Sequence, residues 1–424
     1  MIVGFAVIML ICCSLPILSY LRTGDAPHDY GSWYETGRKI LRGEELYPSG
    51  RDFPFMYPPL AAIMLAPLAL FGELPCILAL VLVNSAAWVA SVILSVYLVT
   101  GRMFRQAPLL YLLPALCTLP FSWDAYHLGQ PNLLLLALML GAFACLRNKQ
   151  EWGAGALVAL AAAIKAFPVM AIGYFVYRRH WKALTATLLS LALFFVAIPV
   201  VVRGVDQGTQ DVTTWTKGMV LKYDQDNIGQ RSSRAYSWKN QSLIGLVNRL
   251  LRHKGVNEEA GETGEYRSSN FYVNLLDLDF LTTNAVIVTI ALGLCLCYVA
   301  VMPRYSLRTP SSDAIEYAIV LIFILIFSPY LFRYFFIWLL YPFTVLVHLW
   351  LTAPKPSSEA RWLRASFFAI LFLLALSVVF HQSFTRPLAD AYGNAFLACL
   401  LAFGTLAWQL AKFKRAGQRT ATAG

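Results

Sequence analysis

Charged side chains are scarce in this 424-residue chain, because Asp, Glu, Lys and Arg together make up only 13% of it. Soluble globular proteins carry about 25%. Hydrophobic residues reach 58%, and the mean hydropathy is +0.59. So little charge cannot cover the surface of a soluble enzyme of this length, and the composition also excludes a disordered chain and a disulfide scaffold. A polytopic membrane protein remains, in which apolar runs of about 20 residues each cross the bilayer.

Several motifs are also missing. The chain has no glycine-rich nucleotide loop, no P-loop and no HExxH. The acidic pair Asp277 and Asp279 lies in an apolar stretch and is a poor candidate for a metal-dependent nucleotide-sugar site. The eight cysteines lie in or beside apolar runs, and Cys295 and Cys297 have no nearby histidine. We therefore expect buried free thiols, no structural zinc, no metal site and no cofactor.

Basic residues outnumber acidic ones by 34 to 23, giving a net charge of +11. No basic run alternates with the aromatic residues that bind single-stranded nucleic acid, so no nucleic-acid partner is expected. The basic residues collect instead in short loops that begin near Arg102, Arg147, Arg178 and Arg304, and in the tail after Lys412. By the positive-inside rule these parts are cytoplasmic. The prediction is a multi-pass plasma-membrane (inner-membrane) protein with both termini in the cytoplasm and a site facing the extracytoplasmic side.

The fold class predicted is all-α, with about 10–13 transmembrane or half-membrane helices. The first apolar run lacks a basic leader and a small-residue cleavage site, so we interpret it as an uncleaved span. The predicted order is a first transmembrane helix at 1–20, an external loop with an amphipathic helix at 21–56, a membrane core at 57–202 with external tips at 121–132 and 164–168, a large external loop at 203–280, C-terminal spans at 281–411 and a cytoplasmic tail at 412–424.

Two segments do not fit simple spans. Residues 57–100 hold two apolar runs but must make one net crossing, so 57–72 is expected to dip into the membrane or to lie at its surface. Residues 153–177 must form a hairpin, which requires two half-helices broken near Lys165 and Pro168. Irregular backbone at membrane depth is tolerated where it lines a polar cavity or is buried in protein. Both segments therefore indicate a site on the outer half of the protein.

The first external loop offers carboxylates. Asp25, His28 and Asp29 precede a predicted amphipathic helix. Its apolar side carries Trp33, Tyr34, Ile40 and Leu41. A carboxylate on an ordered helix at the membrane surface is well placed as a general base. The alternative is that Asp25 or Asp29 only caps the helix.

Other polar residues lie at the predicted tips. His127, Gln130 and Asn132 are candidates for hydrogen bonds to a sugar or phosphate, or belong to an ordinary wet turn. The ammonium of Lys165 in an apolar segment is a functional-site hypothesis by default, with snorkelling or structural pairing as the alternative. Arg333 is a candidate fork for a phosphate, or an interfacial anchor.

Short motifs in a fixed order resemble glycosyltransferase family 87. They are DYGSWYETGRKILRGEELY at Asp29–Tyr47, YPPL at Tyr57–Leu60, GQPN at Gly129–Asn132, AGALVALAAAIKAFP at Ala154–Pro168, RRHW at Arg178–Trp181, NQS at Asn240–Ser242 and SP at Ser328–Pro329. The series runs from about residue 25 to 345, roughly three quarters of the chain.

The resemblance implies a C-type glycosyltransferase fold. It also implies inverting transfer of a hexose or pentose, mannose favoured, from a polyprenyl-phosphate sugar to a lipid or glycan acceptor on the outer face. The first-loop base of the family corresponds to Asp29, with Asp25 as the fallback. By resemblance, Lys165, Gln130 and Asn132 belong to the donor side.

The chain departs from many relatives after the SP pair. It has Tyr330-Leu331-Phe332-Arg333-Tyr334 where they have Trp and His, so Arg333 is predicted to take over a phosphate contact. The remaining candidate contacts, to the acceptor or to other groups, are His28, Tyr57, Asn240 and Gln241. The residues Asn240-Gln241-Ser242 open an amphipathic stretch, and a helix cap is the alternative there.

A membrane transporter or flippase of a lipid-linked or anionic substrate is the alternative function. It would also use broken helices and intramembrane charge. It should show an internal repeat, but the two external excursions occupy non-equivalent places in the chain.

Overall fold

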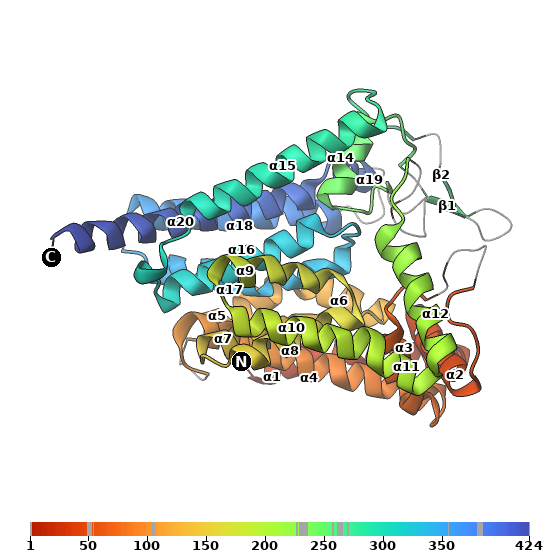
Figure 1. Ribbon diagram of the computed structural model, residues 1–424. Coiled ribbons are helices and arrows are strands. Elements are labelled where there is room, and N and C mark those ends of the chain that lie inside the picture. The colour runs from red at the N-terminus through yellow and green to blue at the C-terminus, as the bar shows by residue number, and fades with distance from the viewer. Residues whose placement is uncertain are drawn as a thin grey trace. The chain divides into compact units, whose positions relative to one another are not determined.

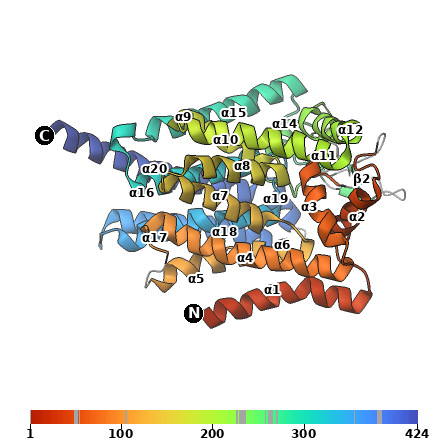
Figure 2. The same ribbon diagram turned by 60° about the horizontal axis from the view of Figure 1, so that its bottom comes forward.

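The computed structural model describes residues 2–48, 53, 55–103, 107–225, 228, 236–256, 258–260, 266–268, 271–354, 356–379 and 385–423. Figures 1 and 2 show that helices dominate this part of the chain. It divides into two compact units, Met1–Lys222 and Tyr223–Gly424.

The first unit carries the N-terminal helices. They are α1 (Ile2–Thr23), α2 (Asp29–Arg42), α3 (Pro59–Ala69), α4 (Glu73–Thr100), α5 (Pro108–Cys117), α6 (Leu119–Leu128), α7 (Asn132–Arg147), α8 (Glu151–Ile164), the 3₁₀ turn η1 (Phe167–Met170), α9 (Ala171–Arg178), α10 (Trp181–Ala192), the π-helix η2 (Leu193–Ala197), α11 (Ile198–Arg203), α12 (Val205–Trp215) and the π-helix η3 (Thr216–Leu221).

The described part of the second unit is also mainly helical and contains one short β-hairpin. Its elements are α14 (Leu243–Leu251), β1 (Glu258–Ala260), β2 (Tyr266–Ser268), α15 (Phe280–Val301), η4 (Tyr305–Leu307), α16 (Pro310–Phe327), η5 (Arg333–Leu339), α17 (Leu340–Thr352), α18 (Ser358–Val379), α19 (Thr385–Ala391) and α20 (Asn394–Ala423). The strands β1 and β2 pair antiparallel, with Glu258 opposite Ser268, an addition to the predicted all-α plan.

Eight helices of the described chain are long and apolar enough to cross a membrane. They are Gly4–Thr23, Glu73–Thr100, Trp181–Arg203, Phe280–Val301, Pro310–Phe327, Arg333–Thr352, Ser358–Val378 and Asn394–Ala416. Four shorter apolar helices, α3, α5, α7 and α8, add to them. A helix rises about 1.5 Å per residue, so these four are too short to cross a hydrocarbon core of about 30 Å on their own. The helical, polytopic fold class is confirmed.

The predicted helix break near Lys165 is present. Helix α8 ends at Ile164, and Lys165 has an extended backbone. The 3₁₀ turn η1, with Pro168 in its first turn, then leads into α9. The break frees the Lys165 side chain from the helix face and aims it at neighbouring segments.

Three details differ from the sequence expectations. The tip at 121–132 is largely helical, since α6 runs to Leu128 and only Gly129–Pro131 form the turn. Leu41 is 46% exposed because α2 packs through Trp33 and Gly37 on a narrower face. Cys295 and Cys297 are exposed free thiols, since α15 packs through few of its residues and its other sides face outward.

Helices α4, α7, α8 and α10 form the packed centre of the first unit, with α7 between α4 and α8 (Figure 2). Helices α8 and α10 approach each other closely at Gly155 of α8. A Cβ atom at this position would lie 2.2 Å from the carbonyl oxygen of Ala183 on α10. Small residues let membrane helices approach closely, and Gly155 serves that purpose here.

We expect Gly155→Ala to lower the thermal unfolding midpoint in detergent, because overpacking costs about 1–3 kcal/mol. Gly173→Ala on α9 is the matched control, since nothing lies within 4 Å of a Cβ placed there. The control should be neutral or slightly stabilising, because Ala is the better helix former. Equal midpoints for the two variants would contradict this packing.

Candidate functional site

Helix α2 holds Asp29 at its first position. The buried face of α2 is tied to the end of α6, because Tyr30 donates through its hydroxyl to the Tyr126 carbonyl at 2.8 Å. Trp33 donates through Nε1 to the Gly129 carbonyl at 2.7 Å. These two bonds, both buried, bring the start of α2 against the turn that carries Gln130.

Gln130 is the centre of the polar contacts in this unit. Its Nε2 donates to Oδ2 of Asp29. Its Oε1 accepts hydrogen bonds from the Tyr57 hydroxyl at 2.9 Å and from Nζ of Lys165 at 3.2 Å. Gln130 is only 3% exposed, so its carboxamide is held by protein groups. Both donors lie at the oxygen end, which leaves the NH₂ end for the carboxylate.

Lys165 has further contacts in the same place. Its Nζ donates to Oδ1 of Asn132 at 3.4 Å, and it lies 5.2 Å from the centroid of the Tyr57 ring. An ammonium over an aromatic face is stabilised by the ring quadrupole. The structure thus brings together four predicted residues around Gln130: Asp29, Tyr57, Asn132 and Lys165.

The arrangement places a carboxylate and an ammonium on opposite ends of one neutral amide. Asp29 is partly exposed, so a substrate hydroxyl can reach its carboxylate. The helix-cap alternative does not describe Asp29, because the residue at the N-cap of α2 is His28 and its side chain makes no cap hydrogen bond. Asp25 is exposed, and its backbone N–H bonds Thr23. Of the two aspartates, only Asp29 contacts Gln130 in the described structure.

The two predicted histidines are in contact. The rings of His28 and His127 meet edge to face, with centroids 4.3 Å apart. Burial lowers the pKa of His127, the nearby His28 lowers it further, and Asp124 acts in the opposite direction. His28 has a positive φ of 48°, an uncommon backbone conformation for a residue with a side chain. His28 therefore precedes Asp29 in a strained backbone conformation, and His127 of α6 packs against its ring.

The NQS residues belong to the second unit and make structural contacts there. Asn240 donates to the Pro329 carbonyl at 2.9 Å and accepts from the Leu331 N–H at 2.9 Å. Gln241 donates to the Asp390 carbonyl at 2.7 Å. Ser242 caps α14 by accepting from the Gly245 N–H. The NQS and SP motifs thus form one hydrogen-bonded corner, and the cap alternative holds for Ser242.

Arg333 opens η5 in this second unit, and its Nη1 donates to the Ser377 carbonyl at 3.4 Å. Arg249 was not singled out from the sequence, yet it is fully buried and donates to the carbonyls of Ser237 and Asn240. An arginine in the middle of an amphipathic stretch is the signal that could have revealed it, since a buried guanidinium must find acceptors.

No group of three or more His, Cys, Asp or Glu side chains that could hold a metal ion occurs among the described residues. Lys165 brings a positive charge close to Asp29, because both residues are hydrogen-bonded to Gln130.

The fold and site define a polytopic membrane protein with a carboxylate and an ammonium joined through one amide. The chain belongs to glycosyltransferase family 87, whose model matches residues 55–329. That range contains Tyr57, Gln130, Asn132 and Lys165, whereas Asp29 precedes it. The resemblance seen in the motifs is confirmed.

Among similar proteins is a polyprenol-phosphate-mannose-dependent alpha-(1-2)-phosphatidylinositol pentamannoside mannosyltransferase of Mycolicibacterium smegmatis. It is 33% identical over 206 residues, which cover 48% of this chain and 46% of that protein. A polyprenol-phosphate-mannose-dependent alpha-(1-2)-phosphatidylinositol mannoside mannosyltransferase of the same organism is 28% identical over 246 residues, half of each chain. The matches thus span about half the length of these relatives.

A likeness to a solved structure extends over more of the chain. ArnT from Cupriavidus metallidurans, bound to undecaprenyl phosphate, is 13% identical with a TM-score of 0.44. The match covers 96% of this chain and 77% of that chain.

We expect Gln130→Leu to lower the unfolding midpoint, because it leaves Asp29, Tyr57 and Lys165 without their shared partner. A buried polar group that loses its partner costs about 1–3 kcal/mol. Gln150→Leu is the control, since Gln150 is exposed. The midpoints of both variants and the wild type, measured in the same detergent, check this. A Gln130→Leu midpoint equal to that of Gln150→Leu would show that the Gln130 carboxamide does not stabilise the fold.

Proposed function

We propose that this protein is a membrane glycosyltransferase that moves mannose from polyprenyl-phosphate mannose to a lipid or glycan acceptor. Membership of glycosyltransferase family 87 supports the reaction class. The names of the similar mannosyltransferases support the sugar and the lipid-linked donor. The observation that carries the proposal is the contact chain from Asp29 through Gln130 to Lys165.

Asp29 is the proposed general base. Its carboxylate takes the proton of the acceptor hydroxyl while the hydroxyl oxygen forms a bond to the anomeric carbon of mannose. The bond between that carbon and the phosphate oxygen breaks, and the lipid phosphate leaves with the bonding electrons. A single displacement of this kind inverts the anomeric centre.

Lys165 is the proposed contact of the departing phosphate. Negative charge develops on the leaving oxygen, and a preorganised cation in a water-poor site stabilises it strongly. The neutral amide of Gln130 separates Lys165 from Asp29, so the two charges do not have to neutralise each other directly. With Lys165 in this role the transfer requires no metal ion.

The remaining predicted residues have supporting roles in this proposal. Asn132, beside Lys165, and His127, beside His28, are hydrogen-bond donors for the donor sugar or its phosphate, and His28 is a candidate contact of the acceptor. Arg333 is the phosphate-binding candidate of the second unit. The contacts of Asn240 and Gln241 favour a role in holding the turn at Pro329–Leu331.

The protein lies in a membrane, as the eight candidate spans among its described residues indicate. We propose the plasma membrane, with both termini in the cytoplasm and Asp29 on the extracytoplasmic side. The basic loops support this orientation, since Lys and Arg collect on the cytoplasmic side. A polyprenyl-linked donor would present its phosphate at the opposite surface.

Asp29→Asn should lower the transfer rate by about 10²–10⁴-fold, the usual contribution of a positioned general base. The amide cannot take a proton but has nearly the same shape, so folding should be preserved. Asp25→Asn is the matched control and should keep wild-type transfer. Rates of purified protein with labelled polyprenyl-phosphate mannose measure both. Full activity of Asp29→Asn would remove the base assignment.

A panel of labelled donors tests the substrate class. We expect turnover with polyprenyl-phosphate mannose, none with nucleotide sugars, and the same rate with and without EDTA, because Lys165 supplies the positive charge at the leaving group. Product anomers resolved by NMR should show inversion. Turnover only with a nucleotide sugar, or loss of transfer in EDTA, would contradict the mechanism.

A further inference from the structure

The segment that carries Tyr57 lacks helix and strand in its described residues between α2 and α3. Backbone carbonyls without such pairing need other donors. Three of them receive side-chain hydrogen bonds. Arg203 Nη2 donates to Glu44 at 2.6 Å, Trp215 Nε1 donates to Met56 at 3.0 Å, and the Tyr47 hydroxyl donates to Tyr57 at 2.7 Å. We call these three bonds the carbonyl clamp.

A buried ion pair aims the first of these donors. Arg203 Nε donates to Oδ2 of Asp211 at 2.9 Å, and the two side chains are 3% and 2% exposed. Nε2 of Gln207 donates to the other carboxylate oxygen, Oδ1 of Asp211, at 2.9 Å. A Cβ at Gly208 would lie 2.6 Å from the Pro199 carbonyl, so glycine is what lets α12 fold back on α11. The guanidinium is thereby fixed in direction toward Glu44.

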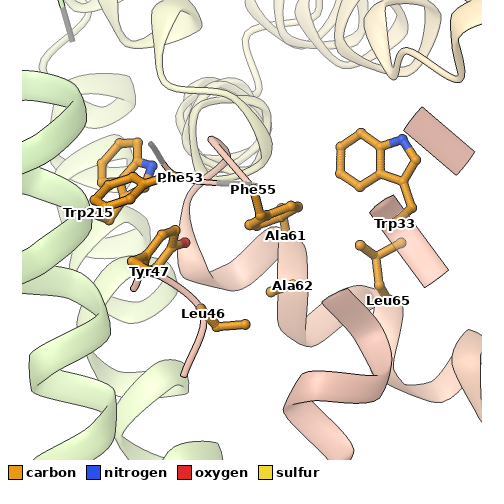
Figure 3. Packing of buried hydrophobic residues seen from close by; sticks show 9 residues of the cluster. All are labelled: Trp33, Leu46, Tyr47, Phe53, Phe55, Ala61, Ala62, Leu65 and Trp215. Atoms are coloured by element: carbon orange, nitrogen blue, oxygen red, sulfur yellow. The ribbon is translucent and has the colours of Figure 1, made fainter. Parts of the chain in front are cut away.

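Apolar packing shields the other two donors. Figure 3 shows Trp215 and Tyr47 within one buried cluster. Its members are Trp33, Leu46, Tyr47, Phe53, Phe55, Ala61, Ala62, Leu65 and Trp215. Burial raises the pKa of Tyr47 well above its ordinary value, Asp211 adds to this, and Arg203 opposes it. Tyr47 therefore keeps its proton and remains a donor to the Tyr57 carbonyl.

The clamp acts on Gln130 through Tyr57. The Tyr57 hydroxyl donates to Oε1 of Gln130, as Lys165 does. Two donors at that oxygen decide which end of the carboxamide faces Asp29. If Tyr57 withdraws, Oε1 loses one of these two donors, and the orientation of the amide toward Asp29 is held less firmly.

We propose that Arg203, Asp211 and Trp215 are positioning residues for the transfer reaction. They hold the Tyr57 segment so that Tyr57 keeps the Gln130 amide oriented toward Asp29. This inference rests on the proposed function, because it concerns the base of that reaction. It assigns a role to α11 and α12 that the sequence motifs do not contain.

Trp215→Phe tests the proposal because it removes the indole N–H and keeps an aromatic ring. We expect kcat to fall about fivefold, as for one lost hydrogen bond of ordinary strength. KM should stay near its wild-type value, because the indole acts through the Tyr57 segment and is not proposed to touch a substrate. Trp181→Phe is the matched control, because Trp181 is 55% exposed at the start of α10. It should change neither kcat nor KM.

Tyr57→Phe separates positioning from general loss of structure. In the Tyr57→Phe background, adding Trp215→Phe should lower kcat by less than twofold, because both substitutions break one chain of contacts and such effects are not additive. Independent fivefold effects that multiply would overturn the proposal. A Trp215→Phe enzyme with the same kcat per folded molecule as Trp181→Phe would also overturn it.

Asp211→Asn is the second variant if Trp215→Phe does not fold, and the same fall in kcat is expected of it. Hydrogen exchange of the amides at 55–61 provides a readout without activity. It should speed up in Trp215→Phe and not in Trp181→Phe, and unchanged exchange would contradict the clamp. A wild-type protein that turns over no donor would instead contradict the proposed function, while the exchange result would still test the clamp.

Discussion

One buried carboxamide organises the polar centre of the first unit. Gln130 binds a carboxylate with its nitrogen, and a hydroxyl and an ammonium with its oxygen, so three segments far apart in sequence converge on it. An amide suits this place because it is a neutral group that carries two N–H donors and a carbonyl acceptor on one rigid plane. A serine could not bridge the distance, and a glutamate would bring a second negative charge against Asp29.

The electrostatic logic follows from the apolar surroundings. A lone ammonium or carboxylate among apolar side chains is costly, and a direct ion pair would consume both charges. With Gln130 between them, Asp29 and Lys165 stabilise each other through polarised hydrogen bonds, while each retains capacity for a substrate. The partly exposed position of Asp29 fits a group that must exchange protons with an acceptor. The two ends of the amide thus correspond to the two ends of the proposed displacement, the hydroxyl that attacks and the phosphate that leaves.

Much of the fold could be predicted because hydropathy is a local property. Runs of apolar residues indicated the spans, and Lys165 with Pro168 indicated the break after Ile164. The candidate site was found through charges in unexpected places, as with Asp29 and Lys165. Helix α6 was missed because Trp123–Leu128 is polar and aromatic, without a clear helical period. The contacts of Trp215 and Arg203 were missed because each donor lies 159 residues from its acceptor carbonyl, and no local pattern reports such a bond.

The NQS residues show a second limit of prediction from local sequence. Polar residues at the start of an amphipathic stretch suit both a helix cap and a substrate contact, and the sequence alone does not distinguish these two roles. In the structure Asn240 uses both ends of its amide on the backbone of Pro329 and Leu331. The amides of Gln130 and Asn240 thus make the same kinds of hydrogen bond for different purposes. Asn240 holds backbone in place, whereas Gln130 holds charged side chains, and the nature of these partners makes Gln130 part of the candidate site.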